Sequence, residues 1–451
     1  MTLYTRNSIQ SFAQRRGPLF LGGRMHRFLY IIFLPFFITS CSYVDTTNTI
    51  VAIQIQDRNG LTETISAPER LKNYDETDFL APQPYKKVLR IYRNQGKNQS
   101  KITTYHPNGL AWQYLEAEEL RAFGIYKEWH PNGQLHIEAH VIGGTADVSS
   151  NAQKDWLFHG VSHVWNEQGF LIAKIPYKQG MLEGVSTYFY ASGEIEKELP
   201  YRGHILEGIA IEYYPDHQIH SKTTYVQGEK TGPSVGYFKN QQLAWTEEYR
   251  DNLLINGAYY SPGAEIISTV ESGSGLRALF DGEYLSYLVQ VQQGFIEGKV
   301  KQFTRQGDLV SSYFVKNGKK TGTETVYFLP HEIEGTEAKD LQPKITVNWE
   351  DHTIHGSVKT WYSTGQMQSQ KDFCHNKKTG PSMSWYRNGS LMLVEEYEED
   401  RLVKGNYYKK NALDAISSVT NGNGLVTLYD ENGVFLRKIP YLKGEPVDPS
   451  E

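Results

Sequence analysis

Glycine recurs along most of this chain at an interval of 24 residues, twice stretched to 25, and this periodicity constrains the fold more than any other feature. A repeat of this length is one supersecondary unit, which must stack on its neighbours to bury its apolar face. The sequence therefore predicts a repeat array rather than a globule around one core. The repeating glycines fall in three runs: Gly160, Gly184, Gly208, Gly232 and Gly257; Gly298 and Gly322; and Gly356, Gly380 and Gly405. Gly124 and Gly424 open further units at either end.

Each unit carries apolar residues at fixed distances from its glycine. An aromatic residue stands five positions later, an apolar residue eleven positions later and usually another aromatic residue seventeen positions later. With a turn over positions 7 to 10, side-chain alternation would place positions 1, 3, 5, 11, 13, 15 and 17 on one face of a hairpin. We therefore expect the position-five aromatic residues to form the core of the array: Trp129, Trp165, Phe189, Tyr213, Tyr237, Trp361, Trp385 and Tyr429. Stacking of sugar rings on these aromatic rows is the alternative role.

The residues between the two strands of a unit have the composition of a tight turn. Examples are Pro107-Asn108-Gly109, Pro131-Asn132-Gly133 and Arg387-Asn388-Gly389. Asn and Gly tolerate positive φ, and Pro presets the first corner of a turn. His106 and His130 precede two of these turns and are expected to flank them. Each unit should be one β-hairpin, which is stable only beside its neighbours.

The units resemble the bacterial variant of the MORN repeat (membrane occupation and recognition nexus). Residues 184–208 and 380–389 match its consensus closely, and the resemblance extends over residues 86–446. It implies an all-β fold, an elongated single-layer antiparallel array of β-hairpins that forms a MORN-like solenoid. Proteins of this kind are often labelled YwqK-family antitoxins. The resemblance therefore also implies an alternative role, in which the chain neutralises a partner toxin by binding it, as an immunity-type protein does.

The N-terminal residues have the pattern of a bacterial export signal. The apolar run 28–38 follows basic residues, is too short to span a bilayer, and ends in Ile-Thr-Ser-Cys, which resembles a lipobox. We expect residues 1–40 to be a signal peptide, translation to begin at Met25, and Cys41 to carry lipid that anchors the protein in the envelope of a Gram-negative bacterium. Ser42 favours the outer membrane, because Asp at that position would mark inner-membrane retention. A plain secretory signal with a chance cysteine is the alternative.

The rest of the chain divides into a tether, the array and a short tail. Residues 41–85 are polar, contain three prolines and show no sustained period, so we predict a lipidated N-terminus followed by a disordered linker. The array should occupy residues 86–446 and leave a tail at 447–451. A degenerate stretch near 263–285 is where the array would break into two segments.

Two further departures from the pattern are candidate binding elements. An array of like hairpins offers no pocket, so we expect an insertion at 143–156 and an acidic loop at 329–344 to contact a partner. Neutral drift in exposed loops is the alternative. The carboxylates of the acidic loop would favour a basic partner surface; they are Glu332, Glu334, Glu337 and Asp340.

Other functional classes find little support in the sequence. The net charge of −5, with both signs mixed along the chain, provides no clustered basic surface for nucleic acid. There is no phosphate loop, nucleophile motif, paired acid and base, or Cys/His cluster at ligand spacing, so no cofactor and no metal are expected. Cys374 is expected to be a small, half-buried strand residue. We therefore expect a non-enzymatic scaffold that binds an unknown protein or an envelope glycan, held on a membrane by its lipid.

Overall fold

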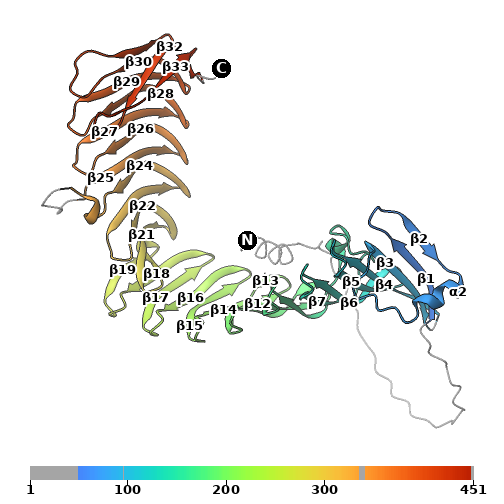
Figure 1. The fold of residues 1–451 in the computed structure, drawn as a ribbon. Coiled ribbons are helices and arrows are strands. Elements are labelled where there is room, and N and C mark those ends of the chain that lie inside the picture. The colour runs from blue at the N-terminus through green and yellow to red at the C-terminus, as the bar shows by residue number, and fades with distance from the viewer. Residues whose placement is uncertain (1–48, 95, 335–340, 448–451) are drawn as a thin grey trace, which may run out of the picture. The chain divides into compact units, whose positions relative to one another are not determined.

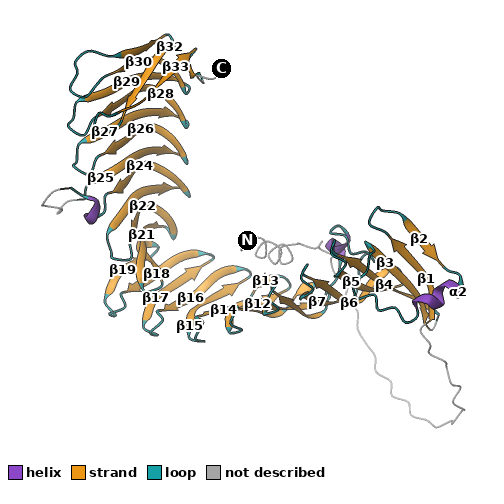
Figure 2. Ribbon diagram, in the orientation of Figure 1, coloured by secondary structure: helices purple, strands orange, loops and turns teal. Residues whose placement is uncertain are grey.

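The computed structural model describes residues 49–94, 96–334 and 341–447. The strands in these residues belong to one open antiparallel sheet of 34 strands, and helix is limited to short turns (Figures 1 and 2). The predicted all-β array of antiparallel hairpins is confirmed. No helix within the described ranges is long and apolar enough to cross a membrane. The predicted signal peptide, Cys41, Glu337 and Asp340 lie outside the described residues.

The chain divides into two compact units, residues 1–229 and 230–451. The elements of the first unit are β1 (Thr49–Gln56), β2 (Thr62–Ile65), α2 (Pro68–Leu71), η1 (Lys72–Tyr74), β3 (Lys87–Asn94), β4 (Lys97–Tyr105), β5 (Ala111–Glu118), β6 (Arg121–Trp129), β7 (Leu135–Val141), η2 (Ala152–Asp155), β8 (Gly160–Trp165), β9 (Leu171–Lys178), β10 (Met181–Leu182), β11 (Gly184–Phe189), β12 (Ile195–Arg202), β13 (Ile205–Leu206), β14 (Gly208–Tyr213) and β15 (Ile219–Val226).

Successive hairpins of the second unit stack side by side in the same way (Figure 1). Its elements are β16 (Glu229–Tyr237), β17 (Leu243–Arg250), β18 (Leu253–Tyr260), β19 (Ile266–Glu271), β20 (Ser274–Asp281), β21 (Tyr284–Gln292), β22 (Phe295–Phe303), β23 (Leu309–Lys316), β24 (Lys319–Tyr327), η3 (Pro330–Glu332), β25 (Pro343–Glu350), β26 (Thr353–Trp361), β27 (Met367–Cys374), β28 (Lys377–Trp385), β29 (Leu391–Glu398), β30 (Arg401–Tyr407), β31 (Ser417–Thr420), β32 (Asn423–Tyr429), β33 (Phe435–Leu442) and β34 (Glu445–Pro446).

A β-bulge in the second strand of each regular hairpin decides which side chains share a face. In β11–β12, Tyr188 pairs with Lys197 and Phe189 pairs with Ile195, so Glu196 is an extra residue in the ladder. The bulge shifts the side-chain alternation between positions 11 and 13 of the unit. Positions 0, 2, 4, 13, 15 and 17 therefore share one face, the core face, and positions 1, 3, 5, 11, 14 and 16 share the other, the outer face.

This bulge corrects the prediction that positions 5, 11, 13, 15 and 17 share one face. Positions 13, 15 and 17 of the unit that begins at Gly160 are Ala173, Ile175 and Tyr177, and all three are buried on the core face. The position-five aromatic residues lie on the outer face instead. Each of the eight is half-buried: Trp129, Trp165, Phe189, Tyr213, Tyr237, Trp361, Trp385 and Tyr429.

In several hairpins the residue at position six, just before the turn, is a tyrosine or histidine that links one hairpin to the next. The Tyr386 hydroxyl donates a hydrogen bond to the carbonyl of Tyr408 at 2.7 Å, and the Tyr362 hydroxyl donates to the carbonyl of Trp385 at 2.8 Å. In the first unit, the Nε2 atom of His130 lies 3.0 Å from the Trp165 carbonyl oxygen. These contacts cross from one repeat to the next and hold the stack in register.

Residues 49–85 are folded, and the prediction of a disordered linker is wrong for them. Strand β1 pairs with both β2 and β3, so it lies inside the sheet. Ile53 and Ile55 of β1 pack in a buried cluster with Leu71 and Phe79. The alternation of Ile53 and Ile55 was the available signal, and it is too short to stand out beside the 24-residue repeat. The segment covers the first hairpin as a terminal cap, which repeat proteins require.

The sheet also continues through residues 263–285, where a break was predicted. β19 pairs with β18 and β20, and β20 pairs with β21. Ser272 and Gly273 have positive φ and form a tight turn between β19 and β20. The glycine-rich sequence is therefore a turn that joins two strands rather than a gap in the array.

Candidate binding surface

Exposed aliphatic side chains form a row on the outer face of the first unit. The position-one residues Ile125, Val161, Val185 and Ile209 are 41%, 49%, 50% and 55% exposed. We call these four residues the aliphatic row. Across each hairpin they pair with the position-sixteen residues, of which two are prolines: His140, Pro176, Pro200 and Thr224.

Aromatic side chains at position five border this row on the same face. The ring of His163 stacks on Trp165 with centroids 5.7 Å apart, and the ammonium of Lys174 lies 5.7 Å from the Phe189 ring centroid. The Tyr213 hydroxyl donates to Glu198 at 2.8 Å. Burial, followed by this hydrogen bond, raises the pKa of Tyr213 to about 12. Polar neighbours therefore contact Trp165, Phe189 and Tyr213, whereas the aliphatic row is about half exposed.

The outer face of the second unit is mixed at the corresponding positions, which are apolar at Pro233, Ala258, Pro381 and Leu425 and polar in the other units. Position-one residues there include Thr323 and Ser357, which pair with Asn348 and Asp372. The same backbone geometry thus carries two different surfaces. Contiguous exposed apolar side chains on a folded protein mark interaction sites. The aliphatic row of the first unit is therefore the candidate binding surface.

The insertion at 143–156, which was expected to contact a partner, covers the core face instead. Trp156 is 5% exposed, and its ring meets Tyr126 edge-on with centroids 4.8 Å apart. Its Nε1 atom donates to the Thr145 carbonyl at 2.9 Å. Val148 and Ala152 are buried as well. The apolar side chains of the insertion are therefore part of the core of the first unit.

The two described carboxylates of the acidic loop bind residues of this chain. Glu332 accepts from Lys344 at 2.8 Å, and Glu334 accepts from both terminal nitrogens of Arg387, at 2.7 and 3.2 Å. Hydrogen bonds from Arg387 and Ser363 lower the pKa of Glu334. These ion pairs hold the start of the loop on neighbouring hairpins. A basic partner would have to compete with them, so the hypothesis that Glu332 and Glu334 recognise a partner loses support.

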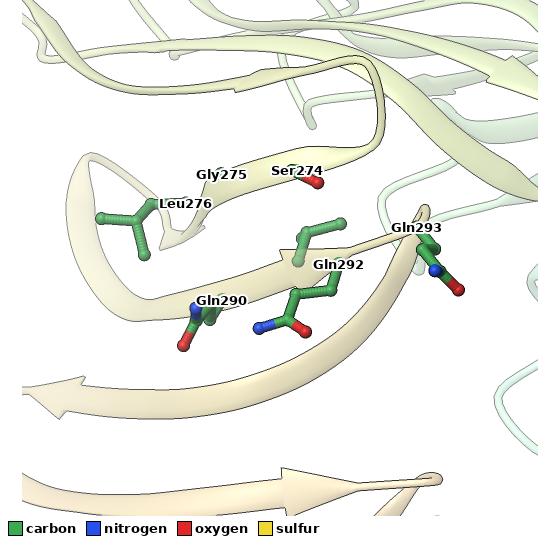
Figure 3. A pocket seen from close by; sticks show the side chains of 7 residues that line it. Ser274, Gly275, Leu276, Gln290, Gln292 and Gln293 are labelled. Carbon is green, nitrogen blue, oxygen red and sulfur yellow. The ribbon is translucent and has the colours of Figure 1, made fainter.

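A shallow hollow lies on the second unit between β20, β21 and the following turn (Figure 3). Ser274 and Leu276 line it on one side, and Gln290, Gln292 and Gln293 line it on the other. The side-chain oxygen of Gln290 already accepts a hydrogen bond from the backbone N–H of Lys299 at 3.0 Å. The lining side chains are neutral and provide no acid, base or nucleophile of the strength that catalysis needs.

A buried glutamate, which the sequence pattern did not predict, also lies in the second unit. Glu247 accepts hydrogen bonds from Tyr249 at 2.7 Å, from Tyr259 at 2.8 Å and from Arg277 at 2.7 and 3.1 Å. Burial disfavours the Arg277 charge, but the neighbouring carboxylate outweighs that effect and raises its pKa. Both oxygens of Glu247 are occupied, so this network braces the core rather than presenting a reactive group.

Comparison with known families supports the assignment of the repeats. The family model described as the MORN repeat variant matches residues 124–142, 182–202 and 354–375. These segments overlap the hairpins β6–β7, β11–β12 and β26–β27. No curated protein matches the chain. The chain thus carries MORN repeat variants at three places in a longer array of similar hairpins, an architecture suited to a repeat scaffold for binding.

Proposed function

We propose that this protein is a non-enzymatic scaffold that binds a protein partner through the aliphatic row of its first unit. The observation that carries the proposal is the row itself. Four aliphatic side chains, one from each of four hairpins, are about half exposed on a regular sheet surface. Covering the exposed part of each would contribute about 1 kcal/mol. Four such contacts support a moderate affinity once the costs of association are subtracted.

The chemistry of the row favours a protein over a glycan. Sugars are usually held against open aromatic faces, whereas the row presents Ile and Val beside Pro176 and Pro200. The nearby aromatic rings are partly covered by His163 and Lys174. An apolar strand or helix surface of a partner would fit these aliphatic side chains better than a polar sugar would.

The envelope location remains part of the proposal. The motivation is the short apolar run that ends in a lipobox-like sequence at Cys41. Lipidation of Cys41 would place the scaffold on a membrane surface, with the outer membrane favoured by Ser42. Cys41→Ser should abolish labelling by radioactive palmitate and release the protein from membranes. Unchanged labelling of the variant would contradict the lipid anchor.

The proposed function is tested by placing charge on the row. The variant Val161→Glu/Val185→Glu/Ile209→Glu and the wild-type chain are used to capture proteins from a detergent extract of the cell envelope, with quantitative mass spectrometry. The control, Thr323→Glu/Ser357→Glu, introduces two such charges at position one of hairpins in the second unit. Circular dichroism establishes that all three proteins are folded.

We expect the wild type and the control to enrich the same protein, and the row variant to lose it by at least about tenfold, because each buried carboxylate costs more than 1.4 kcal/mol. Equal capture by the row variant would overturn the proposal. Binding of the wild type to purified cell-wall glycan, abolished by the row variant, would replace the protein partner with a glycan.

A further inference from the structure

A second cluster with recognisable chemistry lies in the second unit, at the end of the β26–β27 hairpin. His355, Cys374 and His375 bring one ligand atom each to within 4.8 Å of the others. The Cys374 sulfur lies 3.4 Å from Nδ1 of His375, and the rings of His355 and His375 have centroids 4.9 Å apart. The sequence did not suggest this cluster because His355 and Cys374 lie 19 positions apart in the chain.

The hairpin register explains why these side chains meet. Gly356 pairs with Phe373 at the end of the β26–β27 ladder, and His355 and Cys374 are the next residues on the two strands. His355 is half-buried, whereas Cys374 is exposed, which corrects the expectation of a half-buried cysteine. His375 follows in the turn to β28 and is exposed as well.

The turn that carries His375 is held firmly against His355. His375 and Asn376 have φ of 49° and 69°, the conformation of a two-residue type I′ turn. The N–H of Asn376 donates to the Ile354 carbonyl at 2.9 Å, and the Asn376 side-chain oxygen accepts from the Ile354 N–H at 2.8 Å. Two hydrogen bonds thus fix the turn beside the residue that precedes His355. The three side chains are brought together by backbone structure and not by chance rotamers.

Further observations point to a cation at this place. The Nδ1 atom of His355 is buried and has no hydrogen-bond partner in the described residues. The carboxylate of Glu350 lies 3.7 Å from it and adds negative charge. Lys377 pairs with Cys374 across the ladder. Its ammonium donates a hydrogen bond to the Glu399 carboxylate at 3.2 Å instead of to the cluster. An unsatisfied imidazole beside a carboxylate, a thiol and a second imidazole is a set of metal ligands.

We propose that His355, Cys374 and His375 form a binding site for a transition-metal ion of the Zn²⁺ class. Two imidazoles and one thiolate suit a tetrahedral Zn²⁺ ion, with the fourth position open to water. Ligand nitrogens and sulfur in such a complex lie roughly 3.3–3.8 Å apart for metal–ligand bonds of about 2.0–2.3 Å, so small rotations of the side chains suffice. Binding releases the thiol proton, because the thiolate is the ligand.

The array offers natural replacements for the two histidine ligands. Gln occupies the position of His375 in other hairpin turns, as at Gln179 and Gln227, both with similar positive φ. Thr precedes the repeating glycine in neighbouring units, as at Thr321 and Thr379. His375→Gln and His355→Thr should therefore remove a ligand without disturbing the hairpin, and Cys374→Ser removes the sulfur alone.

Cobalt titration of the full-length chain, purified without a histidine tag and kept reduced, tests the site. We expect one Co²⁺ per chain, with a thiolate-to-cobalt charge-transfer absorption that Zn²⁺ displaces. Cys374→Ser should lose this absorption, and His355→Thr and His375→Gln should weaken binding by at least about tenfold. Two controls should bind normally: Cys41→Ser, which removes the other cysteine, and His352→Asn, which alters the equivalent of Asn376 in the preceding turn.

Three results would overturn the site. The first is a wild-type chain that shows no charge-transfer absorption. The second is a Cys374→Ser variant that keeps it. The third is a loss of absorption in Cys41→Ser, which would assign the bound metal to the other cysteine. Thermal unfolding of each variant without metal, compared with the wild type, shows whether a loss of binding reflects a loss of fold.

Discussion

Individual tyrosines and histidines at position six join the repeats. Tyr386 is fully buried, and its hydroxyl reaches the carbonyl of Tyr408 in the following unit. Tyr190 makes the same kind of contact in the first unit, with the Tyr213 carbonyl at 2.6 Å. The sequence shows an aromatic residue or histidine before many turns, but the bond it makes depends on the distance to the next hairpin. Only the assembled stack reveals that role.

Removal of one such hydroxyl should lower the free energy of unfolding by an amount that depends on pH. Tyr386→Phe should lower the free energy of unfolding by about 1–2 kcal/mol at pH 8, because the Tyr408 carbonyl loses its donor. Burial raises the pKa of Tyr386 to about 12. The stabilisation is therefore complete below the ordinary tyrosine pKa near 10 and is lost as pH rises towards 12, since the unfolded chain ionises first.

Urea denaturation of both proteins at pH 8 and pH 11 measures this effect. The difference in unfolding free energy between wild type and Tyr386→Phe should shrink at pH 11. A difference that stays constant would show that the hydroxyl titrates alike in the folded and unfolded chains, and one that grows would show that folding lowers its pKa. Trp385→Phe, at the half-buried neighbouring position, serves as the control and should show no such pH dependence.

At the scale of the hairpin, the sequence predicts the repeat, the turns and the antiparallel pairing, because these depend on local residue types and spacing. It does not predict the bulge between positions 11 and 13. Glu196 carries no mark that distinguishes an extra ladder residue from a paired one. The sequence pattern therefore places Trp165 and Phe189 on the same face as Ile175 and Tyr177, whereas the structure places them on the opposite face. A bulge is set by how both strands twist together, which a single strand pattern does not contain.

The second turn of each hairpin provides another element-scale test. Asn252 has φ of 66°; its N–H donates to the Lys230 carbonyl at 2.9 Å, and its side-chain oxygen accepts from the Lys230 N–H at 2.8 Å. Asp400 makes the same pair of bonds with Lys378. Asn252→Ala should cost about 1–2 kcal/mol, because it removes an acceptor and strains positive φ. Asn252→Asp should cost much less.

Hydrogen exchange of the β16–β18 amides and chemical denaturation measure both variants. Equal destabilisation by alanine and aspartate would show that the side-chain acceptor contributes little, and that the backbone alone holds the turn against its neighbour.

At the scale of the whole molecule, segments outside the regular repeat complete the core. Residues 49–85 cap the first hairpin, and the insertion at 143–156 covers the core face near Tyr126. Neither role followed from the sequence, because a cap or cover is defined by what it packs against. The ion pair of the acidic loop could not be predicted from the sequence either, because the partner of Glu334 is Arg387, 53 residues further along the chain.

Trp156→Ala tests how far a local loss of stability spreads along the array. Loss of this buried ring should cost about 3–5 kcal/mol locally. Because repeat units contact chiefly their neighbours, faster hydrogen exchange should be confined to the first unit, and residues 230–447 should exchange as in the wild type. Exchange that accelerates evenly in both units would indicate one cooperative globule. The exposed Trp112→Ala serves as a control that should leave both units unchanged.

The central claim, that the aliphatic row is the surface that meets the partner, is tested most directly by photocrosslinking in living cells. A photoreactive amino acid replaces, one at a time, Val161, Val185 and Ile209 in the first unit, and Thr323 and Ser357 in the second. All five side chains occupy position one of their hairpins, so they share one backbone geometry and differ in the surface around them. We predict crosslinks to one common protein from the three row positions and none from Thr323 or Ser357. Crosslinking to that protein from the second unit alone, or equally from all five positions, would contradict the assignment of the binding surface.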